Sequence, residues 1–166
     1  MKPVGIFYGS TSGSTESIAK KIQKALGKDA HLHDISKSDV ATIQKYENLI
    51  FGTSAWGIGD MQDDWEDFID SLNEVNYEGK KIALFGLGDQ EEYPESFVDG
   101  LGTLYCRLPE KSIVVGEWPK DGYDYYFSLA EKEGKLVGLA IDEHHQSDKS
   151  EARIKKWTDQ LKKNFN

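Results

Sequence analysis

Cysteine, positive charge and long apolar runs are all scarce in this sequence of 166 residues. The single cysteine, Cys106, excludes an internal disulfide, a cysteine-ligated iron–sulfur cluster and a zinc ribbon. No apolar run approaches the roughly 18 residues that a membrane-spanning helix needs. We therefore expect a fold that rests on a hydrophobic core, with Cys106 buried in helix packing, where free cysteines are commonly found.

The first residues also lack the marks of a targeting segment. Met1 is followed almost at once by the apolar run Val4–Tyr8, without a charged leader, a signal-length apolar stretch or a small-residue cleavage site. The length fits one domain, and no linker, repeat or low-complexity tract divides the chain. We expect a single domain over residues 1–166 and a cytoplasmic location.

Basic residues are outnumbered, 20 against 29 acidic ones, and the net charge is −9. This charge opposes binding to phosphate backbones and to anionic membranes, so we expect neither nucleic acid nor a membrane as a partner. The acidity fits solubility, and it also fits steering toward a basic protein partner. Composition alone does not separate these two interpretations.

Strand and helix patterns alternate along the chain, which predicts a parallel sheet with helices on both faces. Helical spacing is clear at Ile18 and Ile22, from Trp65 to Leu72, and from Ile154 to Phe165. Short apolar runs predict strands at residues 4–8, 31–33, 49–52, 82–85 and 113–115. Strand-like residues resume at 137–141 after roughly 20 polar and aromatic residues, which suggests an insertion within the last strand region.

The segment after the first expected strand reads Gly9-Ser10-Thr11-Ser12-Gly13-Ser14-Thr15 and leads into a helix. Free N–H groups, hydroxyls and the positive end of the helix would converge there on an anion. The segment holds no Lys or Arg and lacks the Gly-Lys-Ser/Thr ending of a nucleoside-triphosphate loop. A single phosphate monoester, as in a flavin mononucleotide, suits such neutral donors; a Ser/Thr-rich helix cap is the alternative.

Two further segments carry aromatic residues at expected strand ends. In Thr53-Ser54-Ala55-Trp56-Gly57-Ile58-Gly59-Asp60, Trp56 lies on a loop and is placed to cover a flat ligand, or else to cap the core. The segment from Gly86 to Pro94 offers a second aromatic, Tyr93, so that the two rings could clamp a ligand ring. Glycines at 86 and 88 would let the backbone approach the polar edge of that ring.

Taken together, these segments resemble the flavodoxin family, over nearly the whole chain. The matching segments are Gly5–Glu16, Trp56–Gly59, Gln62–Trp65 and Phe85–Gln90 with Tyr93, and Asp121–Tyr123 and Gly138–Glu143 resemble its long-chain branch. The resemblance implies a flavodoxin-like α/β fold: a doubly wound, five-stranded parallel sheet in the order 2-1-3-4-5, helices on both faces, and FMN at the switch point.

The resemblance also implies roles for single residues. Trp56 would lie on the inner face of the flavin and Tyr93 on the outer face, while the backbone of Gly88 and Asp89 would meet its pyrimidine end. Ala55, Ser54 and Ser14 stand where relatives often carry Thr, Pro, and Asn or Lys, which leaves individual hydrogen bonds to FMN open. The residues implied to bind FMN are Ser10, Thr11, Ser12, Gly13, Ser14, Thr15, Thr53, Ser54, Ala55, Trp56, Gly57, Leu87, Gly88, Asp89 and Tyr93.

The implied function is that of a low-potential one-electron carrier, cycling mainly between the flavin semiquinone and hydroquinone. Its implied partners are basic redox proteins, such as a flavodoxin or ferredoxin reductase and an electron-acceptor enzyme, and it would act as a monomer. Acidic side chains around the pocket would raise the energy of the anionic hydroquinone; these are Asp60, Asp63, Asp64, Asp89, Glu91 and Glu92.

Three alternatives share the architecture. An FMN-dependent quinone or NAD(P)H oxidoreductase would need a nicotinamide site, for which the sequence shows no candidate. A phosphoacceptor signalling domain needs acidic residues after the first strand, where Gly9-Ser10 stands. A flavin module that stores or senses remains open. No residue set suggests catalysis or metal binding, and we expect the four histidines, His31, His33, His144 and His145, to be structural or solvated.

Gly57 generates a testable prediction. By family analogy its carbonyl turns toward the protonated flavin N5 of the semiquinone, and this peptide flip needs backbone angles that other residues resist by roughly 1 kcal/mol or more. Gly57→Ala and Gly57→Asp should therefore lower the semiquinone yield during a reductive titration followed by visible absorption. An unchanged yield in both variants would refute the role of Gly57.

Overall fold

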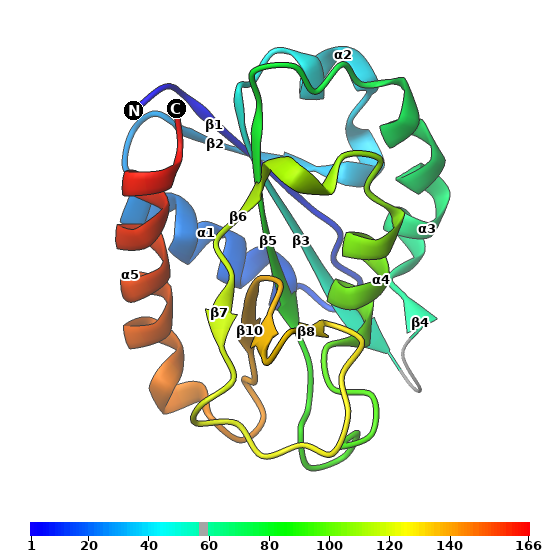
Figure 1. Cartoon of the computed structure of the whole chain (residues 1–166), viewed down its shortest axis with the longest axis vertical. Coiled ribbons are helices and arrows are strands. Elements are labelled where there is room, and N and C mark those ends of the chain that lie inside the picture. Colours follow the sequence, from blue (N-terminus) through cyan, green and yellow to red (C-terminus); the bar gives the residue numbers. More distant parts are fainter. Residues whose placement is uncertain (57–59) are drawn as a thin grey trace.

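The computed structural model describes residues 1–56 and 60–166, and side chains for residues 1–54 and 61–166. A central sheet lies between two helical layers, with α1 (Ser14–Leu26) and α5 (Ser147–Asn164) on one face and α3 (Asp63–Phe68) and α4 (Asp99–Arg107) on the other (Figure 1). Gly57, Ile58 and Gly59 lie outside the described residues, so the role predicted for Gly57 stays a prediction. None of the helices in the described part is both long enough and apolar enough to cross a bilayer.

The core strands form a parallel sheet in the order β2-β1-β3-β5, with β10 at the edge beyond β5. Every residue of β1 is buried, which explains why this central strand reads as one continuous apolar run. The strands of this sheet are β1 (Val4–Tyr8), β2 (Ala30–Asp34), β3 (Asn48–Trp56), β5 (Lys81–Leu87), β6 (Val114–Val115) and β10 (Leu139–Ile141).

The fifth strand of the sheet is interrupted. β6 pairs with the beginning of β5, where Val115 lies opposite Ala83, and β10 pairs with its end, where Leu139 lies opposite Phe85. The two short strands are therefore halves of one strand, and residues 116–138 leave the sheet between them. Counted in this way, the predicted order 2-1-3-4-5 and the predicted insertion are both confirmed. The inserted segment forms a small antiparallel sheet of its own from β7 (Trp118–Pro119), β8 (Glu131–Lys132) and β9 (Lys135–Leu136).

The helices bury the residues that the helical spacing predicted. Ile18 and Ile22 of α1 are buried, as are Ile154 and Trp157 of α5, and the two helices pack against each other. The expected helix from Trp65 to Leu72 is instead α3 followed at Ile69 by a tighter 3-10 turn. The remaining short elements are α2 (Val40–Gln44) and the 3-10 turns η1 (Ile35–Lys37), η2 (Ile69–Glu74) and η3 (Lys111–Ile113).

The expectation that Cys106 is buried was wrong, because its side chain is exposed. On α4 the buried residues Leu101 and Leu104, with Leu108 just beyond the helix, recur at helical spacing and face the sheet. Cys106 lies two positions after Leu104 and two before Leu108, so the helical turn places it on the opposite face. Packing of α4 does not depend on this thiol.

The third strand is longer than its sequence suggested. We expected it to end near Gly52, but β3 continues to Trp56, because β4 (Asp60–Met61) turns back and pairs with it antiparallel. Trp56 therefore ends a strand and does not lie on a free loop. The extension was not visible in the sequence because it depends on pairing with the short strand β4.

Tyr123 fastens the inserted segment to the rest of the sheet. Its hydroxyl accepts a hydrogen bond from Trp118 Nε1 at 2.9 Å and donates one to the carbonyl of Ala140 in β10 at 2.6 Å. The guanidinium carbon of Arg153 lies 4.0 Å from the centre of its ring. Burial raises the pKa of Tyr123 to about 12, so the hydroxyl keeps the proton that it donates at neutral pH.

Removing this hydroxyl should loosen the insertion. We expect Tyr123→Phe to lower the free energy of unfolding by about 1–3 kcal/mol, because the indole N–H of the buried Trp118 and the Ala140 carbonyl would lose their partner. Tyr126 is 80% exposed, and Tyr126→Phe is the matched control, with an expected change below about 0.5 kcal/mol. Urea denaturation at pH 7 checks both values, and equal losses would contradict the assignment.

Candidate functional site

The three loops singled out in the sequence meet at one edge of the sheet. They follow the carboxyl ends of β1, β3 and β5, which are adjacent parallel strands. The chain passes from β1 to α1 on one face and from β3 to α3 on the other, so the winding direction changes between these two strands (Figure 1). Such a switch point leaves a crevice at the strand ends, where open α/β sheets bind their ligands.

The first loop forms a turn that opens the amino end of α1. Ser10 Oγ accepts a hydrogen bond from the backbone N–H of Gly13 at 3.0 Å, and Gly13 has a left-handed φ of 91°. No side chain of the described residues caps α1. The N–H groups of its first turn are therefore left for an external acceptor.

The hydroxyls of this loop divide into two groups. Thr11, Ser12 and Ser14 are exposed, and the hydroxyls of Ser12 and Ser14 lie 3.4 Å apart. The side chain of Thr15, by contrast, is 1% exposed and faces the interior. The open donors are thus hydroxyls and backbone N–H groups without a cation among them, a donor set that fits one phosphate monoester.

Gln62 connects the first loop to α3, although the sequence reading did not select it for the site. It is buried, and its Nε2 donates to Thr11 Oγ1 at 3.2 Å while its Oε1 accepts from the backbone N–H of Trp65 at 3.2 Å. A Cβ on Gly9 would lie 2.1 Å from Gln62 Oε1, so Gly9 is required by this packing. The available signal was an amide residue just before an acidic helix start, which is typical of a capping residue.

The second loop is described only in part. Thr53 is buried and Ser54 half-buried, and these two residues pair with Gly86 and Leu87 of β5 at the end of the sheet. The backbone of Ala55 and Trp56 completes β3, but their side chains lie outside the described ones. The stacking role predicted for Trp56 therefore stays a prediction.

The third loop is organised by Asp89. Its Oδ1 accepts the backbone N–H groups of Glu91 at 3.1 Å and Glu92 at 2.9 Å, and its carbonyl accepts that of Tyr93 at 2.9 Å. This turn leaves Tyr93 36% exposed at the edge of the sheet. Partial burial works against ionisation of Asp89, but the N–H of Glu92, His145 and the N–H of Glu91 together lower the pKa of this carboxyl. Asp89 is therefore a fixed negative charge at neutral pH.

The glycines of this loop have a packing reason of their own. A Cβ on Gly86 would lie 2.7 Å from Leu101 Cβ, and one on Gly88 would lie 2.9 Å from Val98 Cγ1. Val98 itself has a left-handed φ of 47°, an unusual conformation for a β-branched residue. The segment before α4 thus presses closely on the end of β5, which explains both glycines without a ligand.

Asp142, which also escaped the sequence reading, ties the third loop to the end of β10. Its side chain is 0% exposed, and its Oδ2 accepts both the backbone N–H of Gln90 at 3.1 Å and Gln90 Nε2 at 2.8 Å. Its Oδ1 accepts the N–H groups of His144 and His145, each at 3.1 Å. Gln90 Oε1 in turn accepts the N–H of Asp124 from the inserted segment at 2.6 Å. The third loop, the end of β10 and the insertion are thus one connected unit.

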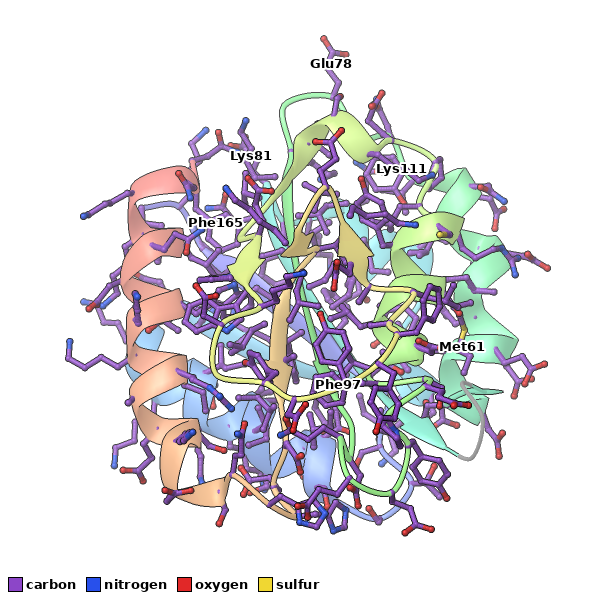
Figure 2. All side chains as sticks on the ribbon, turned by 60° about the horizontal axis from the view of Figure 1, so that its bottom comes forward. Met61, Glu78, Lys81, Phe97, Lys111 and Phe165 are labelled. Carbon is purple, nitrogen blue, oxygen red and sulfur yellow. The ribbon has the colours of Figure 1, made fainter. Side chains whose placement is uncertain are left out.

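This edge of the molecule carries a concentration of acidic side chains. In Figure 2 it is turned forward, with Met61 at one side and Phe97 near the middle, and Glu78 lies at the opposite end of the molecule. Asp63, Glu91 and Glu92 are exposed, and Asp64 and Asp89 are half-buried. Within the residues described, no group of His, Cys, Asp and Glu has the arrangement of a metal site.

The histidines of β2 lie on an edge strand, as expected, and have structural partners. The rings of His31 and His33 contact the hydroxyl of Tyr46 at 3.1 and 2.8 Å. Burial and the neighbouring His31 and Lys45 lower the pKa of His33, which favours its neutral form. This pair packs on the sheet and does not contribute to the crevice.

Comparisons with known proteins agree with this geometry. The family model described as Flavodoxin matches residues 6–157. The chain is 43% identical over 166 residues to the protein called Flavodoxin in Nostoc sp. PCC 7120, covering 99% of this chain and 98% of that protein. It is 45% identical over 165 residues to Flavodoxin 1 of Escherichia coli K12, covering 97% and 93%.

Solved structures give the same result. The structure of Fusobacterium nucleatum flavodoxin bound to flavin mononucleotide matches with a TM-score of 0.93 and 34% identity, covering 100% of both chains. Oxidised Flavodoxin 2 from Bacillus cereus matches with a TM-score of 0.73 and 25% identity, covering 98% and 99%. The resemblance drawn from the sequence motifs is confirmed.

Proposed function

Because this chain belongs to the flavodoxin family, we propose that its three loops hold one FMN at the switch point between β1 and β3 and that the chain carries electrons through it. Flavodoxins are electron-transfer flavoproteins rather than enzymes, and the family membership sets aside the alternative of a quinone or NAD(P)H oxidoreductase. The observation that carries the proposal is the match over the whole chain to an FMN-bound flavodoxin, combined with the neutral, uncapped loop at α1.

The described residues suit the parts of FMN in different ways. The exposed hydroxyls of Thr11, Ser12 and Ser14 and the free N–H groups of α1 would hold the phosphate. Tyr93 would cover the outer face of the ring system, and Trp56 the inner face. The buried Thr15 would contribute its backbone rather than its hydroxyl. The described residues of the set assigned from the resemblance, Ser10 to Thr15, Thr53 to Trp56, Leu87 to Asp89 and Tyr93, lie on these three loops and the strand ends beside them, while Gly57 is assigned from the resemblance alone.

FMN supplies the redox chemistry when it is bound, and the chain sets the electrostatic conditions. The phosphate would add negative charge to a rim that already holds the ionised Asp89 and the exposed Glu91 and Glu92. A second electron placed on the ring would meet this negative field, and aromatic cover would exclude water that could solvate the charge. We therefore propose that the second electron enters at a low potential and that the protein works mainly by gaining and losing this second electron.

An anaerobic reductive titration of the purified protein with FMN, followed by visible absorption, tests this function. We expect the flavin to be reduced in two separate one-electron steps, the second at low potential. Direct two-electron bleaching would contradict a one-electron carrier. Failure to bind FMN would overturn the assignment of all three loops.

Flavodoxins exchange electrons with redox partner proteins, and we propose that the partners of this chain are basic, such as a flavodoxin or ferredoxin reductase and an electron-acceptor enzyme. The support is the cluster of acidic side chains around the crevice on a chain of net charge −9. Opposite charges of this kind steer association and set the orientation of docking.

Charge reversal distinguishes steering from simple solubility. We expect Asp63→Lys and Glu91→Lys to slow electron transfer from a basic ferredoxin reductase by about two- to tenfold at low salt, and the difference should shrink in 0.5 M salt. Glu78→Lys makes the same charge change at the opposite end of the molecule and should leave the rate within about twofold (Figure 2). Stopped-flow absorption measures these rates, and equal effects at all three sites would refute local steering.

We also propose that the protein acts as a monomer in the cytoplasm. Large apolar side chains are exposed at few described positions, and Tyr93, Tyr126, Phe127 and Leu129 among them belong to the third loop and the insertion. The single cysteine, Cys106, is an exposed free thiol, which suits a reducing compartment.

A further inference from the structure

The ring of His145 lies between two carboxylates of the third loop. Its Nε2 is 2.8 Å from Asp89 Oδ1, and its Nδ1 is in close contact with Glu91 Oε2. The His145 side chain is 34% exposed, that of Asp89 17% and that of Glu91 68%. One imidazole therefore bridges the residue that organises the loop and a residue of the acidic rim.

The backbone of His145 is held in place by a buried side chain. Its N–H donates to the buried carboxylate of Asp142 directly after β10, and that same carboxylate holds Gln90. Asp89, on the other side of the ring, sets the turn that ends in Tyr93. The His145 ring is thus a bridge from a rigid strand end to the loop that carries the outer aromatic.

The bridge depends on a proton. A neutral imidazole has one N–H and can donate to one carboxylate only, whereas the imidazolium donates from both ring nitrogens. Imidazole gains and loses this proton between about pH 5 and 8. The charged or titratable groups that face the His145 ring are Asp89 and Glu91 of the third loop. The ring of His144 lies beside it, with 6.3 Å between the ring centres, and the carboxylate of Asp142 accepts the backbone N–H of His145.

We propose that His145 is a positioning residue that acts through Asp89 and Glu91 on the loop of residues 89–93 and so makes FMN affinity and the second reduction potential depend on pH. This inference rests on the proposed function. Protonation of His145 would let both of its ring nitrogens donate hydrogen bonds, one to Asp89 and one to Glu91. It would also offset one negative charge beside the flavin. As pH falls, the loop is held more firmly and the reduced, anionic flavin is stabilised.

Two variants of His145 and one matched control test the role. His145→Gln removes the imidazole, and His145→Lys keeps a positive charge at both pH 6 and pH 8.5. His144→Gln makes the same change at the neighbouring residue, whereas the described ion pairs of Asp89 and Glu91 with a histidine are both made by His145. His144 and His145 are both exposed, so these substitutions should leave the core intact.

The first readout is the dissociation constant of oxidised FMN at pH 6 and pH 8.5. His145→Gln should bind FMN about two- to fivefold more weakly than the unaltered protein at pH 6, the range of a partly exposed ion pair, and about equally at pH 8.5. His145→Lys should match the affinity of the protonated protein at both pH values. Because the lost positive charge matters most for the anionic, fully reduced flavin, that state should lose a further two- to fivefold in affinity at pH 6, which lowers the potential of the second electron by roughly 20–40 mV.

The second readout needs no flavin. In the protein stripped of FMN, urea denaturation should show a stability loss in His145→Gln that is larger at pH 6 than at pH 8.5, because the two hydrogen bonds require the proton. An affinity loss that is equal at both pH values, or one reproduced by His144→Gln, would overturn the proposal. If the unaltered protein did not bind FMN, the proposed function would fall, while the stability difference would still decide whether the bridge exists.

Discussion

The buried carboxylate of Asp142 is the contact on which the arrangement of the site depends. A charge with no exposed surface is costly unless its lone pairs are filled, and here two groups of Gln90 and the backbone N–H groups of His144 and His145 fill them. Gln90 extends the contact to Asp124 of the insertion. The third loop is therefore positioned by two segments that are distant from it in sequence, the end of β10 and the insertion, and its exposed residues can be acidic without the loop losing its shape.

Contacts between segments that are distant in sequence also stabilise the interrupted fifth strand. An insertion in the middle of an edge strand would expose the end of β5, yet β6 and β10 each pair with their own half of it. Tyr123 fastens the inserted segment to β10, and Gln90 fastens it to the third loop. The insertion therefore borders the crevice, and it brings the exposed aromatic residues Tyr126 and Phe127 close to Pro94, whose carbonyl accepts both of their N–H groups.

Charge is distributed unevenly around the site, and this distribution suits the proposed function. The phosphate would be held by neutral hydroxyls and by the positive end of α1, without a lysine or arginine in the loop. The rim beyond it is acidic, so the negative charge of bound FMN is not compensated. With FMN bound as proposed, both features would raise the energy of an added electron, and the same rim would attract a basic partner. His145 is placed where one proton would moderate this field.

The sequence by itself determined the alternation of strands and helices, the Gly/Ser/Thr segment before the first helix and the family motifs, because each is a local signal. The sheet order 2-1-3-4-5 followed only from the resemblance to the flavodoxin family, since strand pairing joins residues far apart in the sequence. Tertiary structure decided what local patterns do not contain. Cys106 faces outward because only one side of α4 meets the sheet, and β3 reaches Trp56 because β4 returns to pair with it. Gln62, Asp142 and His145 belong to the site for the same reason: their partners lie far away in the sequence. His145 and Asp89, for example, are 56 positions apart, and the parallel sheet brings their side chains to 2.8 Å.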